Sequence, residues 1–178
     1  MSVRPIELAV DLCARLDVDA YVIFVHDDER PLWGLGGLLD WRLAGGLSRM
    51  LAASLLGTAA GDRTLASPEG ACIFVVGLGA AELDDARFEA RAREAAHAVE
   101  KAGWSSVAVG VPEMLPSEAS TVILTRCFAG LKGNVTIVTA TGHVVAPAPA
   151  TTVSLAPANR GAAEPSWGGK SRKGGKRK

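Results

Sequence analysis

Four side chains of types that bind metal ions follow one another at His26, Asp27, Asp28 and Glu29. An imidazole next to three carboxylates supplies the nitrogen and oxygen ligands that divalent cations take in proteins. Consecutive residues at the end of a strand point to opposite faces, so these four cannot converge on one ion without a sharp turn. A solvated exit from a strand is therefore the favoured interpretation, and no metal site is predicted.

Two glycines, Gly77 and Gly79, belong to the segment GLGAAE, which follows an apolar run and precedes a helical pattern. A dinucleotide-binding fingerprint has this placement, because its glycines let the backbone approach a pyrophosphate. The third glycine of that fingerprint is replaced by Glu82, whose charge would repel the phosphates. A tight turn between a strand and a helix is the favoured interpretation.

Gly45 and Gly46 lie inside an otherwise helical pattern, where each glycine costs about 1 kcal/mol relative to alanine. Either a helix begins at Leu47 and offers its free N–H groups to an anion, or a neighbouring backbone approaches closely there. The sequence leaves both explanations open. Gly45, Gly46, Gly77 and Gly79 are thus the candidate ligand-binding residues if the chain binds a nucleotide.

The other titratable and nucleophilic residues form no local catalytic set. His97 is predicted to be partly buried in a helix, and His143 to lie in a late turn. Cys13, Cys72 and Cys127 are too widely spaced for a zinc cluster or a disulfide framework. We expect neither a catalytic residue nor a cofactor.

Apolar runs typical of strands and apolar stripes typical of helices alternate along the chain. Strands are predicted at 20–26, 71–76 and 106–111, with shorter or weaker ones at 5–12, 64–66, 134–140, 144–145 and 151–155. Helices are predicted at about 40–56, from Asp84 or Asp85 to Ala102, and at 117–132. The alternation predicts a three-layer α/β/α sandwich with a mixed, mainly parallel sheet, in which the late strands add antiparallel pairs.

Charge is distributed unevenly along the chain. Residues 1–155 are predicted to form one domain, and residues 156–178 a disordered tail rich in glycine, lysine and arginine. Six of the 19 basic residues fall in the last nine positions, which leaves residues 1–169 with 13 basic against 19 acidic side chains, a net charge of −6. The six are Lys170, Arg172, Lys173, Lys176, Arg177 and Lys178. Such a tail suits weak, salt-sensitive contact with a nucleic acid or another polyanion.

No long apolar run and no secretory leader is expected. Glu7 and Asp11 interrupt the apolar core that a signal sequence would need, and no charge-free apolar run approaches the 18 or so residues of a membrane span. We expect a cytoplasmic protein without a membrane partner.

The order of these features resembles the N-terminal domain of the leucyl aminopeptidase family, peptidase family M17. The resemblance rests on AYVIFVHDD, then LLDWRLAGGLSRMLAAS, then IFVVGLG, a helix rich in Ala, Arg and Glu, and a strand that ends at Pro112. It covers about residues 5–132 and implies an architecture similar to that of macro domains.

The catalytic domain of that family has no counterpart in this sequence. The NTDAEGR segment is absent, and too few residues follow Lys132 to build such a domain. The resemblance therefore implies a non-catalytic module that acts through contacts with a protein partner or by self-association. One alternative is a macro-like domain that binds ADP-ribose or a nucleotide, although the Asn-Ala-Asn type of segment expected in such binders is absent. Another is association with nucleic acid through the basic tail.

Overall fold

The computed structural model describes residues 3–7, 16–80, 83–113, 115 and 117–139. The chain divides into two units, residues 1–146 and 147–178, and the second lies wholly outside the described residues. The short strands expected at 144–145 and 151–155, the basic tail, His143 and Cys13 lie outside the described residues as well. The predicted boundary at residue 155 stays a prediction.

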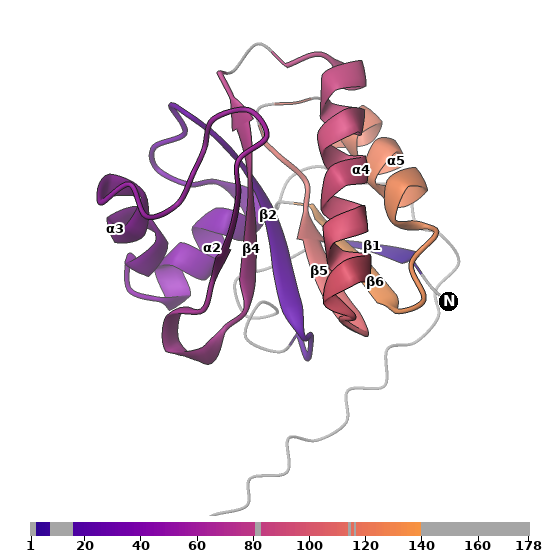
Figure 1. The fold of residues 1–178 in the computed structure, drawn as a ribbon, viewed down its shortest axis with the longest axis horizontal. Helices are drawn as coiled ribbons and strands as arrows, with labels where there is room; N and C mark the ends of the chain where they lie inside the picture. The colour runs from indigo at the N-terminus through magenta and orange to yellow at the C-terminus, as the bar shows by residue number, and fades with distance from the viewer. Residues whose placement is uncertain (1–2, 8–15, 81–82, 114, 116, 140–178) are drawn as a thin grey trace, which may run out of the picture. The chain divides into compact units, whose positions relative to one another are not determined.

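Strands and helices alternate along the described part (Figure 1). The strands are β1 (Val3–Glu7), β2 (Ala20–His26), β3 (Arg63–Ala66), β4 (Ile73–Gly79), β5 (Ser106–Gly110) and β6 (Asn134–Thr139). The helices are α2 (Gly34–Arg42), α3 (Gly46–Ala52), α4 (Asp85–Ala102) and α5 (Ser117–Phe128), with a short 3-10 turn at Pro68–Gly70.

The strands form one six-stranded sheet in the order β1-β6-β5-β2-β4-β3. Every neighbouring pair is parallel except β3 and β4, which run antiparallel. Antiparallel pairs were expected among the late strands; of these, β6 pairs parallel with both β1 and β5, and the others lie outside the described residues. Helix α5 crosses over from β5 to β6 and so brings β6 back in the same direction as β5.

Helices cover both faces of the sheet, as the alternation predicts. Alternate side chains of β2 show the two layers, because Val22 and Phe24 pack in the core under α4 and α5 whereas Ile23 and Val25 pack under α2 and α3. All seven residues of β2 are buried, and so are all seven of β4. The three-layer α/β/α sandwich is therefore confirmed.

Helix α4 has the bounds that its sequence predicts. The Asp84 side chain accepts a hydrogen bond from the backbone N–H of Arg87 at 2.8 Å and caps the first turn. Gly103 ends the helix in the left-handed conformation, at φ +73°. Helix α5 starts at Ser117 as predicted, but it ends at Phe128, four residues before the predicted end.

The single helix predicted at 40–56 is wrong. Two helices occupy this stretch, and α2 begins six residues earlier than predicted, in the glycine-rich segment itself. The break falls at Ala44 and Gly45, whose φ angles are +48° and +79°, values that a continuous helix excludes. Leu55, inside the predicted helix, lies beyond the end of α3 and is 62% exposed.

Candidate functional site: a crevice at the carboxyl edge of the sheet

The two central strands β2 and β5 separate before they end. They pair only from Ala20↔Val107 to Val22↔Val109, although β2 continues to His26. Beyond that point the chain leaves β2 toward α2 on one face, whereas β5 leads to α5 on the other. A crevice where neighbouring parallel strands send their chains to opposite faces is the usual ligand site of an open α/β sheet.

A small recess lies at this separation. Its lining comes from the ends of β2 and β5 and from the first turn of α2, and includes Glu29, Trp33, Gly36, Gly110 and Glu113. Its volume is about 10 Å³, which is room for roughly one water molecule. A larger hollow of about 280 Å³ lies at the opposite edge, beside Glu100, Trp104 and Lys132. The position of the smaller recess, not its size, makes it the candidate site.

The carboxylate of Glu29 joins the end of β2 to the start of α2. Its Oε2 accepts a hydrogen bond from the backbone N–H of His26 at 3.2 Å, and its Oε1 accepts one from the backbone N–H of Trp33 at 3.1 Å. Glu29 is only 8% exposed. These two bonds compensate a carboxylate for its burial, so Glu29 was wrongly assigned to a solvated strand exit.

Glycines let the first turn of α2 approach the end of β5. Gly34 has φ +53°, and a Cβ placed there would lie 3.4 Å from the Val111 carbonyl oxygen. A Cβ on Gly110 would lie 2.8 Å from the Cβ of Leu35, so only glycine fits between β5 and α2. The first turn of α2 carries no acidic residue and no side-chain cap, and its N–H groups and dipole favour an anion.

The predicted pair Gly45 and Gly46 starts the short helix α3. Of the two explanations that the sequence left open, the first holds, because the glycines lie at the start of a helix. The carboxylate of Asp40 reaches this helix start, because its Oδ1 accepts from the Ser48 N–H at 2.9 Å and its Oδ2 from the Ser48 hydroxyl at 2.5 Å. The Asp40 carboxylate therefore occupies the position at this helix start where an anion would bind.

The predicted pair Gly77 and Gly79 closes the end of β4 against another part of the backbone. A Cβ on Gly77 would lie 2.6 Å from the carbonyl carbon of Thr58, and one on Gly79 would lie 3.0 Å from the Cβ of Ala60. The Gly79 N–H donates to the Thr58 carbonyl at 2.9 Å. The lining of the recess includes none of the four predicted glycines; their part in ligand binding stays a prediction.

His26, the last residue of β2, is completely buried. Within the described part of the chain, neither ring nitrogen has a hydrogen-bond partner. A buried polar group left unpaired costs about 1–3 kcal/mol, so this histidine departs from the usual pattern of buried polar side chains. Among the described residues, no group of three or more His, Cys, Asp or Glu could hold a metal ion.

The surface around the crevice is mostly acidic. Exposed carboxylates follow each of the three strands that end there, and they belong to Asp27, Asp28, Asp84, Asp85, Glu113 and Glu118. The exposed basic side chains in the same loops are Arg30 and Arg87. Hydroxyl or amino groups are better partners for such a surface than a bare phosphate, except at the first turn of α2.

The remaining histidine and cysteines of the described part lie elsewhere. His97 was predicted to be partly buried, but its side chain is 63% exposed and lies 3.8 Å from the Glu100 carboxylate. Burial raises the pKa of the Cys72 thiol and of the Cys127 thiol above the ordinary value. Both thiols are therefore protonated and weakly nucleophilic at neutral pH.

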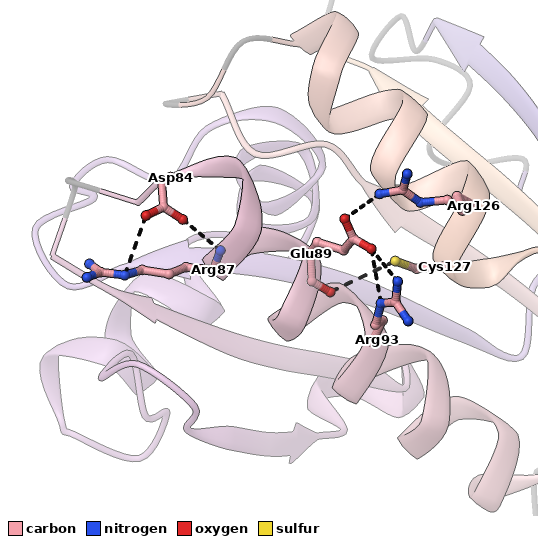
Figure 2. A network of polar contacts seen from close by, with 6 residues as sticks. All are labelled: Asp84, Arg87, Glu89, Arg93, Arg126 and Cys127. Atoms are coloured by element: carbon pink, nitrogen blue, oxygen red, sulfur yellow. Dashed lines mark hydrogen bonds and ion pairs between the residues drawn. The ribbon is translucent and has the colours of Figure 1, made fainter.

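A polar network joins helices α4 and α5, which cover the face of the sheet opposite α2 (Figure 2). The Glu89 carboxylate of α4 accepts hydrogen bonds from Arg93 of the same helix and from Arg126 of α5. The Cys127 thiol lies 3.9 Å from the Glu89 carbonyl oxygen, to which it donates. This network fixes α4 against α5.

Comparison with known proteins shows the fold. No family model and no curated protein matches the sequence. A tomato leucine aminopeptidase mutant has a similar structure, with a TM-score of 0.58 and 17% identity over 79% of this chain and 32% of the aminopeptidase. This chain therefore spans about a third of that enzyme.

Macrodomains match over nearly their whole length. The macrodomain of Mycobacterium tuberculosis DarG has a TM-score of 0.59 and 13% identity, over 78% of this chain and 97% of its own. Thermosipho africanus DarTG, solved in complex with ADP-ribose, has a TM-score of 0.54 and 12% identity over 72% of this chain and 40% of its own. The fold is macro-domain-like, as the resemblance implied.

Sequence reasoning missed the residues that build the crevice. Gly34 and Gly36 precede the predicted helix at 40–56, Gly110 falls in a predicted strand, and Glu29 was taken for a solvent-facing residue. The available signal was the glycine-rich segment WGLGGLLDW, which follows a buried strand after a charged turn at 27–32, since a helix start that follows a strand can receive an anion.

Proposed function

We propose that this chain is a macro-like binding module that takes ADP-ribose or a related nucleotide in the crevice between β2 and β5. The observation that carries the proposal is the early separation of these two strands, next to a helix start whose glycines admit close approach. The likeness to macrodomains, one of them solved with ADP-ribose, supports the same ligand class.

The crevice must widen to accept such a ligand, since the recess now has room for about one water molecule. In the proposed complex the phosphates lie against the first turn of α2, where the free N–H groups and the helix dipole favour negative charge. The Trp33 side chain, 54% exposed at the rim, offers a flat surface on which a base can stack.

Calorimetric titration with ADP-ribose tests the proposal. We expect binding, and we expect Trp33→Ala to weaken it by about tenfold, the loss of one stacked base. Trp41→Ala is the matched control, because Trp41 is 73% exposed at the other end of the same helix and lies outside the lining of the recess. The absence of heat at millimolar ADP-ribose would contradict the proposal, and equal losses in the two variants would remove Trp33 from it.

A second candidate is a non-catalytic module that acts through contacts with a protein partner or with a second copy. Its supporting observation is a set of exposed large apolar side chains at separate places in the chain: Trp41, Leu55, Leu65 and Val122. Single exposed apolar residues are common on protein surfaces, so this candidate ranks below the first. Sedimentation over a wide range of concentration tests the self-association part of it.

A further inference from the structure

His26 is the one buried side chain near the crevice whose polar atoms no described residue satisfies. The ring is 0% exposed, and neither nitrogen has a partner among the described residues. The neighbouring positions Val22 and Phe24 are apolar and equally enclosed, so an apolar side chain would suit position 26 better for stability alone. Such departures from local rules are concentrated at functional sites.

The His26 side chain is outside the lining of the recess, and the connection of this residue with the crevice runs through its backbone. His26 ends β2 beyond the last pair with β5, and its register partner on the other side is Gly79 of β4. Its backbone N–H donates to Glu29, the carboxylate that also lines the recess. Movement of Glu29 would therefore break a hydrogen bond to the backbone of His26.

We propose that His26 is a ligand-binding residue, whose ring hydrogen-bonds to hydroxyl groups of a sugar when the crevice is occupied. This inference rests on the proposed function, and it adds that the sugar of the ligand lies at the end of β2. A neutral imidazole has one N–H donor and one acceptor, and a sugar hydroxyl both donates and accepts.

The charges around His26 favour hydroxyls over phosphate. The Glu29 carboxylate is bound to its backbone, and Asp27 and Asp28 follow it directly. Carboxylates accept hydrogen bonds from hydroxyl groups and repel phosphate. The phosphates are then left for the first turn of α2, whose own residues are not acidic, although the Glu29 carboxylate accepts from the Trp33 N–H at its N-cap.

His26→Phe separates a binding role from a structural one, because phenylalanine keeps a ring and removes both unpaired nitrogens. We expect this variant to be at least as stable as the unmodified chain, yet to bind ADP-ribose at least about tenfold more weakly. Ser120→Ala is the matched control. The Ser120 hydroxyl is also buried, at 1% exposure, and has no partner among the described residues, so its removal is expected to leave the affinity unchanged.

Nitrogen resonances of the imidazole rings in the unmodified chain give a second measurement, which does not depend on how a variant folds. ADP-ribose should shift the two ring nitrogens of His26 and leave those of the exposed His97 in place. Inorganic diphosphate, which has no hydroxyl of a sugar, should not shift them.

ADP-ribose binding with unchanged His26 resonances, or with full affinity in His26→Phe, would overturn the inference and leave the proposed function standing. The ring would then be satisfied by an internal water. The absence of any ADP-ribose binding would overturn both.

Discussion

At the end of β4, two glycines allow a neighbouring backbone segment to pack closer than any side chain would permit. Gly77 donates its N–H to the Asp62 carbonyl, and its own carbonyl accepts from the Gly61 N–H. Gly79 adds a bond to the Thr58 carbonyl. The segment from Thr58 to Asp62 therefore runs along the end of β4 at a distance that no Cβ would permit.

Gly77→Ala tests this close approach. The added methyl group would overlap the backbone of Thr58 and Ala59, so we expect a loss of about 3 kcal/mol in the free energy of unfolding. Gly130→Ala is the control, because nothing lies within 4 Å of a Cβ at that position, and its effect should stay within about 0.5 kcal/mol. Urea unfolding measures both, and equal stabilities would refute the assignment.

The sequence identified Gly77 and Gly79 as unusual but suggested a turn as the reason. Only glycine fits at these positions because of a segment 15 to 21 residues earlier in the chain. Contact between distant segments leaves no periodic signal in the sequence. The same applies to His26, because its burial was predictable from the run AYVIFVH, whereas its lack of partners depends on where β5 ends.

Among the elements, helix α4 was the most predictable, since its cap, its apolar stripe and its terminal glycine are all local features. The break between α2 and α3 was missed for a physical reason. Leu43, Leu47 and Leu51 keep a spacing of four residues across the break and are all buried on the same face of the sheet. The apolar pattern therefore continues although the backbone does not.

The link between α4 and α5 should depend on pH through Glu89. The hydrogen bond from Arg93, helped by the charge of Arg126, holds the pKa of Glu89 below its ordinary value of 4.5. A lowered pKa in the folded state means that the ionised form is stabilised by folding. Its contribution to stability is present above pH 4.5 and is lost as the pH falls through the folded-state pKa.

Glu89→Gln is therefore expected to destabilise the chain at neutral pH, and the difference from the unmodified chain should vanish at acidic pH. Glu94→Gln is the control, since Glu94 pairs with Arg91 within α4 and does not reach α5 in any bond described. Chemical unfolding at a series of pH values measures the difference. A gap that persists below the folded-state pKa would show that Glu89 acts through something other than its charge.

For the molecule as a whole, the sandwich and its largely parallel sheet followed from the alternation of strands and helices. The order of the strands did not, because crossovers between distant segments place β1 beside β6 and β2 between β5 and β4. Among the described residues no helix is long and apolar enough to cross a membrane. The six basic residues at 170–178 lie outside the described part, so nucleic-acid association through them stays a prediction, as does a cytoplasmic location.

Self-association is the prediction that belongs to this scale. If the second candidate function holds, the sedimentation coefficient should rise with concentration, and Trp41→Ser should reduce that rise because Trp41 is the most exposed of the large apolar side chains. Val122→Ser, on the opposite face of the sheet, serves as the comparison. A coefficient that is constant over the whole range would exclude a second copy as the partner.

The antiparallel strand β3 has a further consequence for the chain at high concentration. β4 is seven residues long, fully buried and without a charged side chain. Beyond the segment that covers Gly77 and Gly79, its outer edge is paired with the four residues of β3, from Arg63↔Val76 to Ala66↔Ile73. An uncovered strand of that composition is a template for edge-to-edge aggregation. The new edge is the free side of β3, which is a poor template because β3 is short and carries the charged Arg63. The four residues of β3 therefore protect the sheet from growing into a fibril.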